Sequence, residues 1–503
     1  MQRSSRWLWA QLATLHRWLG TLLCLCFLVW FSSGLVMLFV PFPSLTDAAR
    51  RAQSEPLALA GVRVAPAAAL LRSGGGSALR LLSVDGVPRY VVTQGERLTS
   101  VDAGSGAVLG LLSPAQARAV AEGFGRRPVR TLSGPLQVDQ WTVHQRLDPW
   151  RPFYRAALDD ADGTTLYVSA RTGEVMQRTR AAERYWNWLG SIPHWLYFSA
   201  LRRDFALWDR TVWWLALSAL AAALAGTALG IHRSLQARRR PVPDWSPYRN
   251  LLRWHHGLGL VAAAIVLAWI FSGWLSMDHG RLFSRGQPSP QALQRYAGGD
   301  LGTALAAVAP ATLQRLDGSS EICFQLVGGQ VWASGYGRAA ASTIDLQGAD
   351  RTPHRLTRAE RAAAIARAAA RAWAVADTTT LPSDALYRQA DAVADDALRL
   401  TLKAPTGAQL YFDAVSGQPL LLLDSSRQAY AWLYFAVHTT RLPGTAQRPR
   451  LHLAIQLTLL GLGWCLSLSG LLLGIRFLRR RVGQRAPARP ARPLPSTATN
   501  GGR

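Results

Sequence analysis

The sequence predicts a membrane protein: a four-transmembrane-helix bundle from a tandem duplication, with two α+β domains outside the membrane. Three observations predict this class. They are four long apolar runs, basic residues gathered at one set of their ends, and a repeat that relates the two halves of the 503-residue chain. Hydrophobic residues make up 49% of the chain, 20 residues are Trp, and the formal net charge is +26, a combination that is unusual for a soluble domain.

Each apolar run is long enough to form a membrane-spanning helix, because about 20 helical residues cross the hydrocarbon core of a bilayer. The runs cover residues 18–40, 211–231, 257–277 and 453–475. The first run is longer than the core of roughly 7–15 residues in a cleavable signal peptide, so we interpret it as a retained helix.

The basic residues indicate how these helices are oriented. Lys and Arg gather in MQRSSR before the first run, in RSLQARRR after the second and in RFLRRRVGQR after the fourth. The positive-inside rule then places both termini in the cytoplasm. Because the excess charge lies beside the spans and in an Arg/Pro-rich tail, its expected partner is anionic membrane lipid and not nucleic acid.

These observations divide the chain into eight parts. We expect transmembrane helices at 1–41, 210–233, 253–278 and 452–478, outer domains at 42–209 and 279–451, a cytoplasmic loop at 234–252 and a basic cytoplasmic tail at 479–503.

The two halves of the chain are related by a repeat with two consistent offsets. An offset of 239 relates His16, Trp30, Ser33 and Gly34 to His255, Trp269, Ser272 and Gly273. An offset of 244 relates Tyr167, Gly173, Trp188, His194, Gly226 and Gly230 to Tyr411, Gly417, Trp432, His438, Gly470 and Gly474. The halves share one topology, so we expect them to pack about a pseudo-two-fold axis along the membrane normal.

The outer segments contain patterns typical of small α+β units. VDAGSGAVL at 101–109, VSARTGEVM at 168–176 and FDAVSGQPL at 412–420 predict β-hairpins around a Gly-containing turn, and TIDLQGADR at 343–351 is a weaker copy. The Ala/Arg-rich stretches 112–124 and 358–374 predict helices that pack on a sheet.

Among the ten histidines, seven in or near the spans are candidate ligands. His16, His232, His255 and His256 lie on the cytoplasmic side, and His194, His279 and His438 on the outer side. Ionisable residues near spans indicate function, and imidazole is a common axial ligand of haem and a ligand of Zn, Cu and non-haem Fe. For any single His, a hydrogen bond at the interface is the simpler interpretation.

Two glycines favour haem among these cofactors. Gly20 follows His16 by four residues, and Gly259 follows His255 by four, so each glycine shares a helix face with its histidine. An absent side chain beside a ligand gives clearance to a flat porphyrin, which a bare metal ion does not need. Close helix packing is the alternative explanation of these glycines.

The pseudo-axis predicts which histidines pair. His194 and His438 are equivalent positions and are expected to hold one haem near the outer surface. On the inner side His16, His255 and His232 compete, with His256 as a second choice there and His279 as a second choice outside.

These motifs together resemble a known family. LHRWLG (15–20) with WFSSG (30–34), RWHHGLG (253–259) with WIFSG (269–273), and DGTTLYVSARTGEV (162–175) are similar to the PepSY-associated transmembrane helix family. That family includes siderophore-iron reductases of the bacterial inner membrane. The resemblance covers nearly the whole chain up to about residue 480.

The resemblance implies four spans, two periplasmic PepSY-like domains and two His-ligated haem b groups. It assigns the helix-mouth ligands to His16 and His255 and the pre-span ligands to His194 and His438. It also implies reduction of a periplasmic ferric siderophore, which releases Fe(II) for uptake. Some relatives carry a fused flavodoxin-like and reductase module that this chain lacks after residue 480, so we expect quinol or a separate cytoplasmic flavoprotein reductase as electron donor.

Two other functions are compatible with the sequence. The chain could be a PepSY-type regulatory or inhibitory membrane protein without redox activity, in which case the histidines are dispensable. It could also be a metal permease with a histidine relay, which would bind no coloured cofactor.

Overall fold

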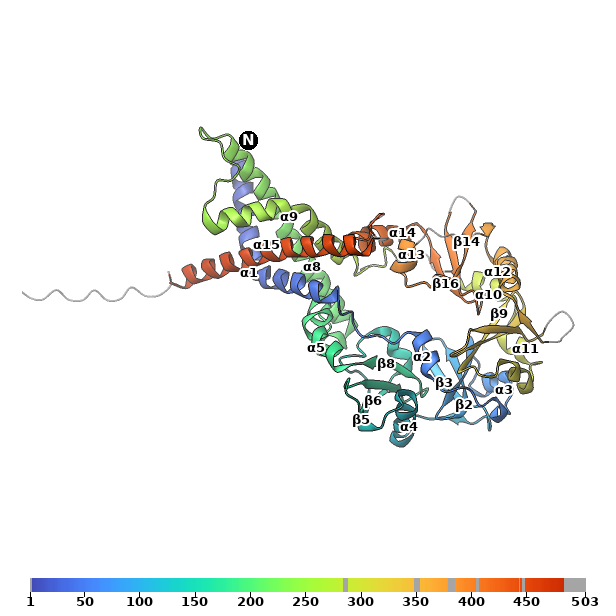
Figure 1. Ribbon diagram of the computed structural model, residues 1–503. Helices are drawn as coiled ribbons and strands as arrows, with labels where there is room; N and C mark the ends of the chain where they lie inside the picture. Colours follow the sequence, from blue (N-terminus) through green and yellow to red (C-terminus); the bar gives the residue numbers. More distant parts are fainter. Residues whose placement is uncertain are drawn as a thin grey trace, which may run out of the picture. The chain divides into compact units, whose positions relative to one another are not determined.

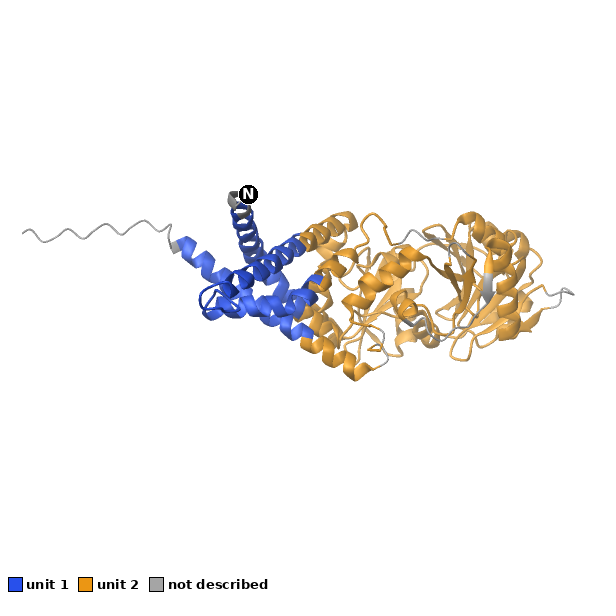
Figure 2. Ribbon diagram, turned by 90° about the horizontal axis from the view of Figure 1, so that it is seen from above, with its two compact units in different colours: residues 1–31, 218–267, 459–503 blue, residues 32–217, 268–458 orange. Residues whose placement is uncertain are grey.

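The structure is a computed structural model that describes residues 2–283, 288–347, 353–378, 385–403, 407–442, 444–445 and 448–483. The chain divides into two compact units. Within the described residues, the first unit draws on 2–31, 218–267 and 459–483, and Figure 2 shows it, in blue, as helices. The second unit draws on 32–217 and 268–458 and contains the sheets.

Among the described residues, four helices are long and apolar enough to cross a membrane. They are α1 (Gln2–Met37), α8 (Phe205–Arg238), α9 (Asn250–Leu275) and α15 (Pro449–Gly483). All four expected spans fall largely within these helices. Only 22–28% of the residues in each apolar stretch are buried, as expected for helices that present side chains to lipid.

Contacts between the four helices repeat with the duplication. Gly230 of α8 packs against Leu260 of α9, and its equivalent Gly474 of α15 packs against Thr21 of α1, the position equivalent to Leu260. A Cβ built on Gly474 would lie 3.5 Å from Thr21. These two equivalent contacts agree with the expected pseudo-two-fold packing of the helices.

The part of the second unit that the structure describes contains three antiparallel sheets (Figure 1). The largest has eight strands in the order β12-β11-β10-β9-β1-β2-β3-β4, and the others have the orders β5-β6-β7-β8 and β13-β14-β15-β16. The strands are β1 (Ala78–Val84), β2 (Val87–Gln94), β3 (Arg97–Asp102), β4 (Val108–Leu109), β5 (Val129–Leu136), β6 (Phe153–Leu158), β7 (Thr165–Ser169), β8 (Val175–Thr179), β9 (Glu321–Val327), β10 (Gln330–Tyr336), β11 (Ser342–Asp345), β12 (His354–Leu356), β13 (Val375–Thr378), β14 (Leu398–Leu402), β15 (Gln409–Phe412) and β16 (Pro419–Leu423).

The eight-stranded sheet joins the two halves of the chain. Strand β1 of the first half pairs with β9 of the second, in the register Leu79↔Phe324 to Leu82↔Glu321. Leu81 and Ile322, which are partners in this pairing, are both fully buried. We expected one outer domain at 42–209 and another at 279–451, and the structure pairs a strand of the first segment with a strand of the second. The reason is that each half would otherwise leave an open strand edge, and pairing removes both edges.

The expected hairpins form around left-handed glycines. β3 and β4, β7 and β8, and β15 and β16 are antiparallel pairs. Gly106, Gly173 and Gly417 sit in their turns at φ between 73° and 79°, a conformation that glycine adopts without steric cost. For the weaker copy, β11 pairs with β12, and the residues between Gln347 and Pro353 lie outside the described residues.

Two helices cover the four-stranded sheets. α4 (Pro114–Gly125) and α12 (Arg358–Ala372) both begin with a capping box, formed by Ser113 with Gln116 and by Thr357 with Glu360. Both helices coincide with the expected Ala/Arg-rich stretches. The apolar face of α12 packs on β14 and β15 in one hydrophobic core.

Shorter helices connect these elements. They are α2 (Asp47–Gln53), η1 (Leu59–Gly61), α3 (Pro66–Arg72), η2 (Gln145–Trp150), α5 (Ala181–Leu189), α6 (Ser191–Trp195), α7 (Ser199–Arg202), α10 (Pro290–Ala297), α11 (Leu301–Leu305), η3 (Pro310–Leu316), α13 (Ala385–Ala390), α14 (Ser425–Tyr430) and the π-helix η4 (Ala431–Ala436).

Buried charges lie at the β1–β9 pair. Arg80 of β1 contacts Glu174 at 2.7 Å, and Arg50 of α2 contacts Glu321 of β9 at 2.8 Å. Burial alone would raise the pKa of Glu174, but Arg80 and Arg50 lower it to about 2. The pKa of Glu321 likewise lies well below its usual range, because its arginine neighbours outweigh the effect of burial. Both carboxylates are therefore ionised at neutral pH.

Candidate cofactor-binding sites

Histidines that the duplication relates face each other in two places. In the helical unit, the ring centroids of His16 and His255 lie 6.4 Å apart with 36° between the ring planes. In the second unit, the centroids of His194 and His438 lie 6.3 Å apart with 73° between the planes. Each pair takes one histidine from each half of the chain.

The hydrogen bond of His16 fixes which of its nitrogens remains for a ligand. Its Nδ1 lies 2.9 Å from the carbonyl oxygen of Ala222 on α8. A carbonyl can only accept, so Nδ1 carries the proton and donates. In a neutral imidazole the lone pair is then on Nε2, which is the nitrogen that a metal would bind.

His255 reaches the same state through a hydroxyl group. Its Nδ1 lies 2.9 Å from Oγ of Ser469, and that hydroxyl donates to the carbonyl of Leu466 at 2.7 Å. Because the only hydroxyl proton is already donated, the Ser469 oxygen accepts from Nδ1–H of His255. Leu466 is the position equivalent to Ala222, so both inner histidines are oriented by equivalent carbonyls.

Serines orient the outer pair in the same way. Nδ1 of His438 lies 3.0 Å from Oγ of Ser272, which donates to the carbonyl of Trp269 at 3.1 Å. Nδ1 of His194 lies 3.0 Å from Oγ of Ser33, the position equivalent to Ser272. Burial lowers the pKa of His438 to about 4, so this imidazole is neutral at physiological pH and can offer its Nε2 lone pair.

The separation within both pairs suits two imidazoles that bind one metal ion from opposite sides. With metal–nitrogen bonds of about 2 Å, the ring centroids in such a complex lie roughly 6 Å apart. Ligand histidines almost always donate their other nitrogen to a fixed acceptor, and Nδ1 of these four is engaged in this way or by a serine hydroxyl. Within the described residues, no group of three or more His, Cys, Asp and Glu gathers as a protein cage for a bare ion.

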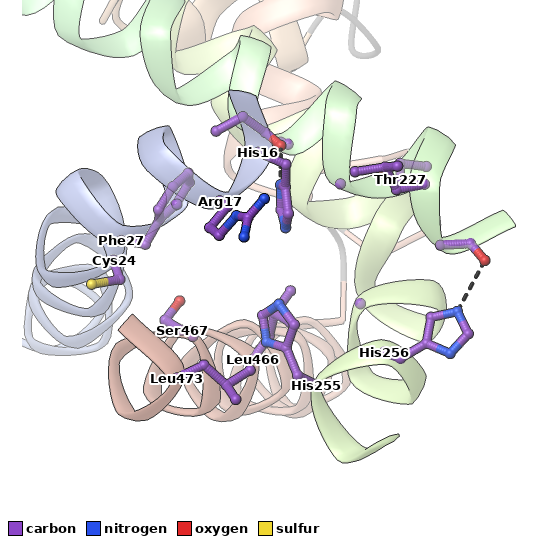
Figure 3. Close-up of a pocket in the computed structure, with 18 of the residues that line it drawn as sticks. His16, Arg17, Cys24, Phe27, Thr227, His255, His256, Leu466, Ser467 and Leu473 are labelled. Carbon is purple, nitrogen blue, oxygen red and sulfur yellow. Dashed lines mark hydrogen bonds between the residues drawn. The ribbon is translucent and has the colours of Figure 1, made fainter. Parts of the chain in front are cut away.

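A cavity of about 530 Å³ surrounds the inner pair. Its volume lies in the range of roughly 300–1,000 Å³ that is usual for cofactor sites. Figure 3 shows His16 and His255 pointing into the cavity, with Arg17 beside His16 and Phe27 across from His255. The rest of the lining is mostly apolar, which suits a large flat ring.

The two expected glycines line this cavity. A Cβ built on Gly20 would meet nothing within 4 Å, and one on Gly259 would meet only Leu466 at 3.8 Å. Gly20 therefore borders open space and is not at a helix–helix contact, as the clearance interpretation predicts. Three features thus suit a planar macrocycle between the histidines: the volume of the cavity, the Nε2 lone pairs and the open space beside Gly20 and Gly259.

Gly226 of α8 allows the His16 ring to lie close to the α8 backbone. A Cβ on Gly226 would lie 2.4 Å from Cε1 of His16, so only glycine lets the imidazole reach the α8 backbone. The equivalent Gly470 lies under His255 with a distance of 3.5 Å to Cε1. The spacing of Gly226 and Gly230 would also suit close helix packing, but the structure places Gly226 against His16.

Interruptions of regular helix position the outer pair. In the first half Gly190 separates α5 from α6 just before His194, and in the second half the π-helix η4 precedes His438. Two residues after each histidine, the equivalent positions Leu196 and Thr440 both have φ of 52°. Left-handed backbone is costly for such side chains and gathers at functional sites.

The other three candidate histidines have different surroundings. His232 stacks flat on Trp9 at 3.8 Å. His256 uses both nitrogens, Nδ1 with Ser246 at 2.8 Å and Nε2 with the carbonyl of Gly230 at 2.9 Å. His279 lies 2.9 Å from a carboxylate oxygen of Asp209. The structure thus brings together His16 with His255 and His194 with His438. Of the other three, His256 lines the inner cavity with both nitrogens engaged, and His232 and His279 belong to neither pair.

The orienting serines were not assigned a role from the sequence. Ser33 and Ser272 are equivalent positions of the repeat, so the sequence marked them as a pair. It did not show which residues their hydroxyl groups contact, because that depends on how the helices pack. Ser469 had no signal at all, since the equivalent position in the first half is Ala225.

Comparison with known proteins gave no match: no family model, no curated protein and no solved structure is similar to the chain at a significant level. The resemblance to the PepSY-associated family is therefore neither supported nor contradicted by these comparisons and stays a prediction.

Proposed function

We propose that this chain is a haem-containing oxidoreductase of the bacterial inner membrane that passes electrons from the cytoplasmic side to a periplasmic ferric siderophore. In this proposal each histidine pair holds one haem b, His16 with His255 on the cytoplasmic side and His194 with His438 on the periplasmic side. One electron converts each chelated Fe(III) to Fe(II), which hard oxygen ligands hold less tightly.

The single observation that supports the proposal is the twofold occurrence of one arrangement. Both pairs join equivalent histidines from the two halves at a ring separation of 6.3–6.4 Å, with Nδ1 engaged in all four. Histidines that only form separate hydrogen bonds at the interface would not need to face each other at the same distance in both places. Two histidines that hold one haem would need this geometry, because both imidazoles would have to present Nε2 to the same iron.

The residues of the chain supply position and environment. A haem bound between each pair would supply a one-electron Fe(III)/Fe(II) couple. Ala222, Ser469, Ser33 and Ser272 orient the imidazoles through Nδ1, and Gly20 and Gly259 leave clearance for the ring. The mostly apolar lining of the inner cavity would exclude water around a bound haem and so contribute to its reduction potential.

The donor and the acceptor follow from the resemblance alone. The ferric siderophore as acceptor follows from the resemblance of the LHRWLG, RWHHGLG and DGTTLYVSARTGEV motifs. Quinol or a cytoplasmic flavoprotein is the donor that the same resemblance implies. No observation in the described residues favours the regulatory function or a metal permease over electron transfer.

The test is a dithionite-reduced minus oxidised absorption spectrum of the purified protein, with haem stoichiometry. Wild type is expected to show b-type bands with two haems per chain. His16→Ala and His255→Ala should each remove one haem, and His194→Ala and His438→Ala the other. His232→Ala and His279→Ala serve as matched controls and should keep both haems.

A colourless wild-type protein, expressed with ample haem, would exclude the proposal and favour the regulatory function. If haem is present but ferric siderophore does not reoxidise the reduced protein, electron transfer stands and the acceptor is wrong.

A further inference from the structure

The inner cavity is not symmetric in charge, although its histidines are equivalent. Arg17 of α1 and Arg233 of α8 both line it. The equivalent positions in the second half are His256 and Phe477. Both of these also line the cavity, but Phe477 is apolar and both nitrogens of His256 are engaged by Ser246 and Gly230. The cationic residues at these four positions thus come from the first half alone.

Neither cavity arginine has a carboxylate partner among the residues that the structure describes. The Arg233 guanidinium donates to the neutral side chain of Gln236 at 3.2 Å, and that of Arg17 lies 5.7 Å from the ring centre of Phe477. Figure 3 shows the nitrogens of Arg17 directed into the cavity beside His16. Guanidinium groups near an apolar cavity favour an anion, and they match carboxylates in geometry.

Arg253 shows that a basic residue at this end of the helices need not be available to a ligand. It lies two residues before His255 and donates to both carboxylate oxygens of Asp244, at 2.8 and 3.1 Å. It also lies 4.6 Å from the ring centre of Trp245. Orientation in the membrane accounts for all three arginines, but it does not account for two of them lining the cavity without a carboxylate.

We infer that the inner cavity recognises a flat ligand with two carboxylates on one edge, one held by Arg17 and the other by Arg233. This inference rests on the proposed function and deepens it, because it makes the two acid groups of haem a condition of tight binding. It also gives the bound ring one preferred orientation, although the two histidines are equivalent.

The experiment compares two porphyrins in one full-length background. His194→Ala/His438→Ala protein, purified from haem-depleted cells, is titrated with ferric protoporphyrin IX and separately with its dimethyl ester. The Soret band of the six-coordinate bis-imidazole complex gives the two dissociation constants. Each charged contact that is lost should cost about tenfold in affinity, so the free acid should bind on the order of a hundredfold more tightly than the ester.

Arginine variants assign that preference to residues. Arg17→Gln and Arg233→Gln should each reduce the preference about tenfold, and the double variant should abolish it. Arg17→Lys keeps the charge and should retain part of it. Arg253→Gln is the matched control and should leave it unchanged. In the reciprocal His16→Ala/His255→Ala background, Arg17→Gln should have no effect on haem binding.

The outcomes separate the two proposals. If acid and ester bind equally with the bis-imidazole spectrum, or if the double variant keeps the preference, the carboxylate site is wrong and haem binding stands. If neither porphyrin gives that spectrum in a background that keeps His16 and His255, both are overturned.

Discussion

Ser272 Oγ lies between two partners, at 3.0 Å from Nδ1 of His438 and 3.1 Å from the carbonyl oxygen of Trp269. Since the hydroxyl gives its proton to the carbonyl, it can only accept from the imidazole, and this sets the tautomer. We predict that Ser272→Ala weakens haem retention at the outer site by about tenfold or more, as loss of such a partner does elsewhere. Haem content after dialysis against apomyoglobin measures this.

The control for that variant lies four residues further on, just past the end of α9. Ser276→Ala removes a hydroxyl that donates to the carbonyl of Gly273 at 2.6 Å and contacts neither histidine of the outer pair in the hydrogen-bond network. If it loses haem as readily as Ser272→Ala, the effect is a general one on the helix and the role given to Ser272 is wrong.

Equivalent glycines should respond unequally to alanine. Gly226→Ala places a methyl group 2.4 Å from Cε1 of His16, whereas Gly470→Ala places one at an ordinary 3.5 Å from Cε1 of His255. We expect Gly226→Ala to displace His16 and lose the inner haem, with a cost of about 1–3 kcal/mol for the overpacked contact. Gly470→Ala should keep it. Haem stoichiometry and thermal unfolding of both variants decide this, with Gly461→Ala, which meets nothing within 4 Å, as reference.

Filling the cavity should separate cofactor binding from folding. Gly20→Leu adds a side chain where a Cβ has open space, and Leu favours helix over Gly by about 1 kcal/mol. The variant should fold with an unchanged or higher unfolding temperature, measured without haem, and should lose the inner haem. Retention of the inner haem would show that the ring does not pass over Gly20.

His256 should not be required for haem binding, but it should be required for the ordered conformation of the loop before α9. Its imidazole holds Ser246 and stacks on Trp245 at 5.7 Å. We predict that His256→Ala keeps two haems, while trypsin cleaves at Arg238–Arg240 several times faster in inside-out vesicles. Loss of one haem would instead make His256 a ligand.

Acid should destabilise the second unit through its buried carboxylates. The pKa of Glu174 is lowered from an ordinary value near 4.5 to about 2, so its ionised form contributes stability that is complete above about pH 4.5. That contribution, on the order of 3 kcal/mol, is lost as the pH falls from 4.5 toward 2. Near-UV circular dichroism between pH 6 and 2 should show this loss, and Glu174→Gln should be less stable at pH 7 with a flatter dependence on acid.

Much of the helical part was predictable because its signals are local. Length and apolar composition gave all four long helices, and periodicity with capping residues gave α4 and α12. The repeat predicted that His194 faces His438, since equivalent positions meet at a pseudo-two-fold axis. It left His232 as a rival of His255 for the inner site, because sequence order does not tell which side of α8 faces the cavity.

The pairing of β1 with β9 could not be predicted from the sequence. Nothing local distinguishes a β1 strand that ends a sheet from one that continues into β9, because the register depends on which edge is left open after folding. For the same reason the cluster of Arg50, Arg80, Glu174 and Glu321 had no signal, as its members are up to 271 residues apart and meet only at that seam.

The contribution of one histidine by each half to each pair has a further consequence. A chain cut within the loop 239–249 would yield two fragments, neither of which contains both members of either pair. Each fragment alone should therefore stay colourless, and the two expressed together should recover both haems by complementation. By the same logic, a primordial single-repeat protein would have needed to form a homodimer, with each haem on its symmetry axis.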